Sequence, residues 1–131
     1  MKYLLDSDFL FGLFVLKDPH HEKTKRVFKE IVESKESIFV LNLVIQETST
    51  VLSRKINQKT ALLFLERLSL LPIKIIRVDE ELEAKAWNLF RGQTKKRISF
   101  IDCANLVSYE SYKLDGILSF DDFYPENKRL K

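Results

Sequence analysis

Short apolar runs alternate along the chain with longer stretches in which apolar residues recur at helical spacing. The short runs predict four strands, over about 2–5, 37–41, 73–78 and 117–120. The longer stretches predict helices over about 9–16, 19–34, 43–56, 60–70, 80–90 and 100–112. Strands that alternate with helices are typical of a mainly parallel sheet with helices on both faces. We therefore expect an α/β fold.

Residues that commonly begin or end helices stand at several of these boundaries. We expect N-caps at Asp18, Asn42, Asp79 and Ser99, with Pro19 in the first turn after Asp18 and a helix end at Gly92. Parallel sheets bind ligands outside the carboxyl ends of their strands. The residues that follow the predicted strands are therefore the first candidates for chemistry.

The composition indicates one small globular domain over residues 1–131. Hydrophobic residues make up 45% of the chain, enough for a core, and there is no internal repeat. The single cysteine, Cys103, excludes an intrachain disulfide and suits a reducing cytoplasm. The longest apolar run, Phe9 to Leu16, is far shorter than the roughly 20 residues that span a bilayer. We expect a soluble cytoplasmic protein with no membrane segment.

Two acidic residues follow predicted strands, and a third lies on an apolar helix face. Asp6 follows the first strand and Asp121 the last, although a helix cap and a turn would also explain them. Glu47 lies on the same helical stripe as Val44 and Val51, where a charge is costly unless it is paired or bound to metal. An ion pair is the alternative, but no basic residue shares this stripe before Arg54.

A fourth acid, Asp102, lies in the first turn of the helix that follows Ser99. A carboxylate there suits the helix dipole, which is the simpler explanation. Its neighbours Phe100, Ile101 and Ala104 are apolar, however, and Asn105 is the polar residue one turn away. An acid in an apolar setting with a polar amide one turn away is typical of a binding site.

Four carboxylates gathered in one place raise one another's pKa values, and a divalent cation removes this conflict. Carboxylate oxygens favour hard cations such as Mg²⁺ or Mn²⁺. Such ions can activate water and stabilise the leaving oxygen of a phosphodiester. The chain carries a net charge of +3, and without these four acids it would be four charges more positive. A basic surface around an acidic metal site favours a polyanion such as nucleic acid as the partner.

The segments that hold these acids resemble those of the PIN domain, in particular the VapC-like toxin ribonucleases of bacterial and archaeal toxin–antitoxin pairs. The resemblance covers essentially the whole chain. Tyr-Leu-Leu-Asp-Ser-Asp resembles the opening strand and first acid, and Leu-Val-Ile-Gln-Glu the segment of the second. Ile-Ser-Phe-Ile-Asp-Cys-Ala resembles the helix of the third acid, and Ile-Leu-Ser-Phe-Asp-Asp-Phe the closing strand and fourth acid. Asp-Pro-His-His-Glu, from Asp18, also resembles a stretch common in these toxins.

The resemblance implies a PIN-like three-layer α/β/α sandwich with a central, mainly parallel sheet of four to five strands. It implies an Mg²⁺- or Mn²⁺-dependent endoribonuclease that forms a homodimer and is blocked by a small antitoxin protein. Asp6 and Asp102 are the expected direct metal ligands. Glu47 and Asp121 complete the acidic cluster, through water or a second ion, and one of them could accept a proton from the attacking water.

Three polar residues near these acids have auxiliary roles that the sequence leaves open. Asp8 stands where the family usually has a short polar residue, so it could join the metal shell or face solvent. Asp122 competes with Asp121 for the fourth position. We prefer Asp121, because it directly follows the predicted strand and Ser119 lies two residues before it. Ser119 could bond a carboxylate or serve an ordinary turn.

Several other features carry weaker expectations. Lys95, Lys96 and Arg97 precede the Asp102 helix and could bind substrate phosphates, although three charges in a loop are also explained by solvation. Cys103 is expected in the core, and His20 and His21 at a solvated helix start. The leucine-rich stretch over 62–71 and the first helix have more apolar residues than one buried face needs, which predicts a dimer or antitoxin surface.

Other functions remain possible on the sequence alone. The chain could be a PIN-fold RNA-processing nuclease without a toxin role, or an inactive module that binds RNA or protein. A signalling receiver domain also has acids after its first strand, but it needs a phosphoacceptor aspartate after a central strand. The predicted strand over 37–41 ends at Leu41-Asn42 instead, which disfavours a receiver.

Overall fold

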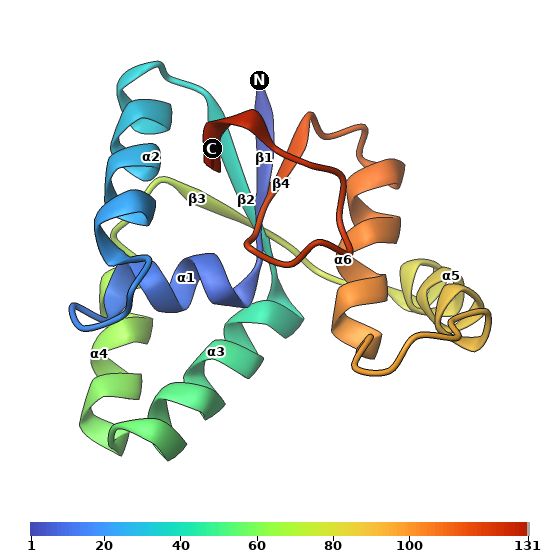
Figure 1. Ribbon diagram of the computed structural model, residues 1–131, viewed down its shortest axis with the longest axis horizontal. Coiled ribbons are helices and arrows are strands. Elements are labelled where there is room, and N and C mark those ends of the chain that lie inside the picture. Colours follow the sequence, from blue (N-terminus) through green and yellow to red (C-terminus); the bar gives the residue numbers. More distant parts are fainter. Residues whose placement is uncertain (131) are drawn as a thin grey trace.

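A fully parallel four-stranded sheet forms the centre of the protein, as seen in a computed structural model that describes residues 1–130 (Figure 1). Its strands are β1 (Lys2–Leu5), β2 (Ser37–Leu41), β3 (Ile73–Ile76) and β4 (Gly116–Leu118). They lie in the order β3-β2-β1-β4, and every neighbouring pair is parallel. The predicted α/β class is confirmed.

Six α-helices flank the sheet. They are α1 (Ser7–Phe14), α2 (His21–Glu33), α3 (Asn42–Lys55), α4 (Gln58–Leu68), α5 (Glu80–Arg91) and α6 (Phe100–Ser111), followed by a 3-10 turn, η1 (Lys128–Leu130). Figure 1 shows α1 to α4 grouped on one side of the strands and the α5–α6 pair on the other. Helices on both sides of a parallel sheet give the expected three-layer α/β/α sandwich. None of the helices in residues 1–130 has the length and apolar character needed to cross a bilayer.

Strand β1 lies inside the sheet, between β2 and β4, and determines where the acids meet. Leu4 and Leu5 are completely buried and pair with Phe39 and Val40 of β2. Because the strands are parallel, their carboxyl ends share one edge, and the residues that follow them converge there. Asp6 is the first residue beyond β1, and its backbone N–H donates to the carbonyl of Leu118 at the end of β4.

Two of the expected helix caps are wrong. Helix α2 begins at His21, because the Asp18 carboxylate instead accepts a bond from the His20 N–H and holds a turn. Helix α3 begins at Asn42 itself, with no side-chain cap. The Asn42 side chain accepts a 3.0 Å bond from the Val78 N–H and so links the end of β2 to the segment after β3. The caps at Asp79 and Ser99 are confirmed, as is the end of α5 at Gly92.

The C-terminal segment returns across the end of the sheet and is anchored to β1. Arg129 Nε donates to the Tyr3 hydroxyl at 2.9 Å, and its guanidinium also pairs with the Glu36 carboxylate. Gly116 lies close to this segment, since an added Cβ would be 2.5 Å from Asn127 Nδ2 and that side chain would have to shift. The anchored segment brings Tyr124 over the carboxyl edge of the sheet, beside the acids.

Candidate active site

Asp6 lies at the centre of the acidic cluster and is only 5% exposed. Its Oδ1 accepts bonds from the Ser7 N–H at 2.8 Å and from Asn105 Nδ2 at 3.0 Å. Its Oδ2 lies 3.0 Å from the Ser119 hydroxyl. The carboxylate is therefore held by groups from the start of α1, from α6 and from the residue after β4, and the last two are far from Asp6 in the sequence.

Asp8, expected only in an auxiliary role, is part of this cluster. Strand β4 ends at Leu118, two residues earlier than predicted, so the chain turns at Ser119 and Phe120 toward the start of α1. Asp8 Oδ2 accepts from the Phe120 N–H at 2.8 Å and lies 3.0 Å from the Ser119 hydroxyl. Its Oδ1 is buried and has no hydrogen-bond partner among residues 1–130. Asp8 thus points into the site and away from solvent.

Glu47 reaches the cluster from helix α3, which follows β2 directly. It is half-buried, and its Oε1 accepts a 3.1 Å bond from the Ser7 hydroxyl. The sequence placed Glu47 on the core-facing stripe, whereas the structure places it at the edge of that stripe. From this position its carboxylate can contact both the protein and a ligand in the site.

Asp102 completes the cluster from the first turn of α6. Its Oδ2 accepts from the Ser99 N–H at 2.9 Å, while the Ser99 hydroxyl accepts from the Asp102 N–H, so the pair forms a capping box. Its Oδ1 accepts a 3.1 Å bond from the hydroxyl of Tyr124. The simple helix-cap explanation therefore accounts for one oxygen of Asp102, and the other faces the cluster.

Tyr124 and Asn105 also contact the acids, and only Asn105 was noted from the sequence. The buried Tyr124 hydroxyl accepts from Asn105 Nδ2 at 3.1 Å and donates to Asp102. Tyr124 was missed because it lies in an irregular segment with no periodic pattern. Asn105 is fully buried, and its Oδ1 has no hydrogen-bond partner in the part of the chain that the structure describes. An unpaired buried amide oxygen is uncommon and indicates a ligand position.

The position of Asp121 corrects the sequence interpretation. Asp121 does not directly follow the last strand, and its exposed carboxylate accepts a 3.0 Å bond from the Phe123 N–H in a turn. It lies at the rim of the cluster, close enough for its charge to raise the pKa of Asp8. Asp122 is also exposed. Both aspartates line a hollow of about 420 Å³ that includes Ser119 and Tyr124.

Burial and mutual repulsion raise the pKa values of carboxyl groups in the cluster, so these groups keep a proton to higher pH than a free carboxyl does. Burial, followed by repulsion from Asp8, raises the pKa of Asp6 from its ordinary value of 3.8 to about 7. Burial is also the main cause that raises the pKa values of Asp8 and Glu47. Ser119 has one hydroxyl proton for two carboxylates, so it can donate to only one of them. A protonated Asp6 resolves this, because it can donate to Ser119 while Ser119 donates to Asp8.

The donor chemistry of the cluster suits a hard divalent cation. Within residues 1–130, no group of three or more His, Cys, Asp or Glu side chains is arranged to hold a metal ion as the side chains stand. The carboxylates of Asp6, Asp8, Glu47 and Asp102 nevertheless converge, and the buried oxygens of Asp8 and Asn105 lack partners. A cation would neutralise the charges that repel one another and satisfy these oxygens.

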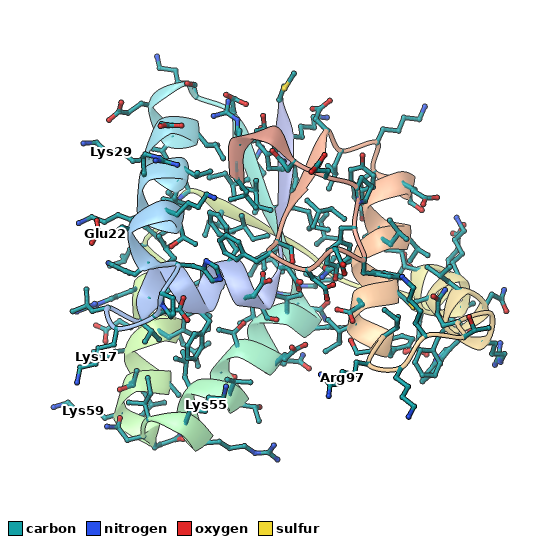
Figure 2. The ribbon with its side chains drawn as sticks, viewed as in Figure 1. Lys17, Glu22, Lys29, Lys55, Lys59 and Arg97 are labelled. Atoms are coloured by element: carbon teal, nitrogen blue, oxygen red, sulfur yellow. The ribbon has the colours of Figure 1, made fainter. Side chains whose placement is uncertain are left out.

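The basic residues named from the sequence lie beside the cluster. Lys95, Lys96 and Arg97 are exposed on the loop between α5 and α6, directly before the helix that carries Asp102. Figure 2 shows Arg97 on this loop and Lys55 at the C-terminal end of α3. Lys55 lines a cavity of about 240 Å³ that also includes Ser7 and Asp8. Basic side chains thus flank the acids on two sides.

Both histidines make contacts that hold the loop between α1 and α2 in place. His21 is buried, and its Nδ1 lies 2.8 Å from the carbonyl of Gly12, so the expected solvated position is wrong for this residue. His20 is exposed at one side but stacks on Phe120 with ring centroids 3.7 Å apart. These contacts fasten the α1–α2 loop to the turn that holds Asp8. Cys103 is buried in the core, as expected.

Comparisons with known proteins agree with this architecture. The family model of the PIN domain matches residues 3–129. A curated relative, "VapC ribonuclease" from Archaeoglobus fulgidus, is 34% identical over 124 residues, which cover 92% of this chain and 78% of the relative. The crystal structure of Mycobacterium tuberculosis VapC20, described as a sarcin-ricin loop cleaving toxin, superimposes with a TM-score of 0.80 at 23% identity and covers 92% of both chains. This chain therefore belongs to the PIN-domain family, among its VapC-like members.

Proposed function

We propose that this protein is a metal-dependent endoribonuclease that hydrolyses RNA phosphodiester bonds and acts as the toxin of a toxin–antitoxin pair. The observation that carries the proposal is the convergence of Asp6, Asp8, Glu47 and Asp102 at the carboxyl edge of the sheet, next to buried oxygens without partners. The archaeal relative bears the name of a ribonuclease, which supports RNA as the substrate.

Asp6 and Asp102 are the proposed direct ligands of Mg²⁺ or Mn²⁺, and Glu47 and Asp8 complete the acidic set. When bound, the metal would supply Lewis acidity toward the phosphodiester and an activated water. Asn105 and Tyr124 hold the carboxylates of Asp6 and Asp102 in place. Asp121, which the sequence placed among the main acids, stays in the proposal as a rim carboxylate that can accept a proton from water.

The remaining expectations from the sequence are proposals of the same kind. We propose that residues 1–131 act as one domain in the cytoplasm, that the protein forms a homodimer and that a small antitoxin blocks it. Exposed leucines on and after α4, namely Leu62, Leu63, Leu65 and Leu70, support a protein contact there. The first helix offers less apolar surface for such a contact than expected, because Phe9 and Leu10 are completely buried and Phe11 and Phe14 are partly buried against the core.

The decisive experiment is cleavage of a mixed pool of structured RNAs in Mg²⁺, in Mn²⁺ and in EDTA. We expect cleavage that requires metal and that Asp6→Asn abolishes. Glu22→Gln is the matched control, because Glu22 is an exposed acid on α2, away from the cluster (Figure 2). If the protein binds metal but cleaves none of these RNAs, the result would favour a nuclease that acts on one narrow RNA target. If it neither binds metal nor cleaves RNA, the result would favour an inactive binding module.

A further inference from the structure

An exposed group of aromatic and basic side chains lies beside the acidic cluster and is not used by the proposed chemistry. We call it the aromatic–basic patch. It consists of Trp87, Phe90 and Arg91 on α5, the loop residues Lys95, Lys96 and Arg97, and Phe100 at the start of α6.

The aromatic part of the patch is ordered by ring contacts. Trp87, Phe90 and Arg91 are three and four residues apart, so they share one face of α5. The Trp87 ring packs against Phe100, with centroids 4.1 Å apart, and meets Phe90 edge-on at 5.8 Å. Trp87 nevertheless remains 40% exposed and Phe90 37% exposed. The indole is thus held in place by its neighbours while much of its surface faces solvent.

The basic part of the patch has charges that the protein itself does not neutralise. Within residues 1–130, Arg91, Lys95, Lys96 and Arg97 have no carboxylate at ion-pair distance. Lys85, on the same helix as Arg91, does pair with Glu81. Three adjacent unpaired cations beside exposed rings suit a partner that is both anionic and aromatic.

The patch leads directly to the acids. Phe100 and Asp102 lie in the same first turn of α6, and the basic loop immediately precedes that turn. Figure 1 shows this loop joining α5 to the end of α6 that lies nearest α3. A chain bound along the patch would therefore pass from the aromatic rings, over the basic loop, to the acidic cluster.

We propose that the aromatic–basic patch binds unpaired nucleotides of the RNA next to the cleavage point, with a base stacked on Trp87 and phosphates on Lys95, Lys96 and Arg97. Single-stranded nucleic acid is recognised by this combination of exposed rings and a basic path, because every base has a face that can stack. The inference rests on the proposed function and adds a nucleotide-binding site at Trp87 and the basic loop.

Trp87 is the only tryptophan in the chain, so its fluorescence reports directly on the patch. We would titrate the Asp6→Asn protein, in EDTA, with a short single-stranded oligoribonucleotide and with a duplex of the same length. The expected result is saturable quenching by the single strand, weaker quenching by the duplex, and loss of affinity with added salt. Binding seen by anisotropy of a labelled oligonucleotide without any change in Trp87 emission would overturn the proposal.

Substitutions test the stacking without relying on fluorescence. We expect Trp87→Ala to weaken binding of the labelled single strand roughly tenfold, in line with the usual effect of one stacked base, and Trp87→Phe to restore most of the affinity. Tyr112→Ala is the matched control, because Tyr112 is 47% exposed at the other end of α6. Replacing Lys95, Lys96 and Arg97 by Ala should flatten the salt dependence. Equal affinities in all these proteins, with circular dichroism showing intact folding, would refute the patch.

Two further outcomes separate this inference from the proposed function. If the wild-type protein cleaves RNA but Trp87→Ala leaves affinity and cleavage unchanged, the inference fails and the nuclease stands. If single strands quench Trp87 but no RNA is cleaved in metal, the patch stands as a binding surface and the nuclease fails. Trp87 emission that shifts with protein concentration in the absence of RNA would assign the patch to contact between copies of this chain, and would overturn the inference.

Discussion

Replacing Asp6 by Asn should separate what this residue does for stability from what it does for activity. The wild-type carboxyl has a pKa of about 7 in the metal-free protein, against 3.8 ordinarily. A folded-state pKa above the unfolded value means that the folded protein binds the extra proton, so this contribution to stability is present at low pH and is lost as the pH rises through about 7. We therefore expect metal-free wild-type protein to become less stable between about pH 5 and about pH 8.

The magnitude follows from the two pKa values. Linkage gives a loss of roughly 2–3 kcal/mol in the free energy of unfolding between those pH values from Asp6 alone. An asparagine resembles the protonated aspartate: its Oδ1 can keep the bonds from Ser7 and Asn105, and its amide can donate to Ser119 Oγ. The variant should therefore lose little stability over this range, and only through the smaller contributions of Asp8 and Glu47.

Urea unfolding of both proteins in EDTA, at about pH 5 and about pH 8, measures this difference. We expect the Asp6→Asn variant to be more stable than the wild type at both pH values, and the gap to be roughly 2–3 kcal/mol larger at the higher pH, because the unfolded wild-type carboxyl is already ionised at about pH 5. Adding Mg²⁺ at the higher pH should narrow this gap, because a ligand at about 100 times its Kd stabilises the protein that binds it by about 2.7 kcal/mol. A variant that is equally destabilised at both pH values would refute the reasoning, since it would show that Asp6 is held as an anion in the metal-free fold.

Two further substitutions test the contacts around the cluster. Tyr124→Phe removes the hydroxyl between Asp102 and Asn105, so it should lower the free energy of unfolding by about 1 kcal/mol and slow RNA cleavage about tenfold. Thermal unfolding and initial cleavage rates measure the two effects. Unchanged rates would mean that Ser99 alone positions Asp102. Gly116→Ala places a Cβ 2.5 Å from Asn127 Nδ2 and should destabilise the protein by about 1–3 kcal/mol. Adding Asn127→Ala to the same chain should recover part of this loss, as measured by urea unfolding. If the effects of the two substitutions on the free energy of unfolding were strictly additive, the contact would be contradicted.

Apolar periodicity was enough to predict the layers of this fold. The four strands and six helices follow from runs of Leu, Ile, Val and Phe at strand or helix spacing, because burial of those faces dominates local preference. Local capping chemistry also identified Asp79 and Ser99, whose bonds reach only three residues along the chain. The same local reasoning failed at Asn42, because its side chain bonds Val78, which is 36 residues away.

The sequence alone also picked out Asp6, Glu47 and Asp102, since each is an acid in an apolar setting on a predicted element. Only the tertiary structure placed Asp8 inside the cluster, put Asp121 at its rim and brought Tyr124 to Asp102. The physical reason is that these choices depend on where β4 ends and on how the irregular C-terminal segment returns across the sheet. Ser119 lies 113 residues from Asp6 and 111 from Asp8, and contacts at such separations leave no periodic pattern in the chain.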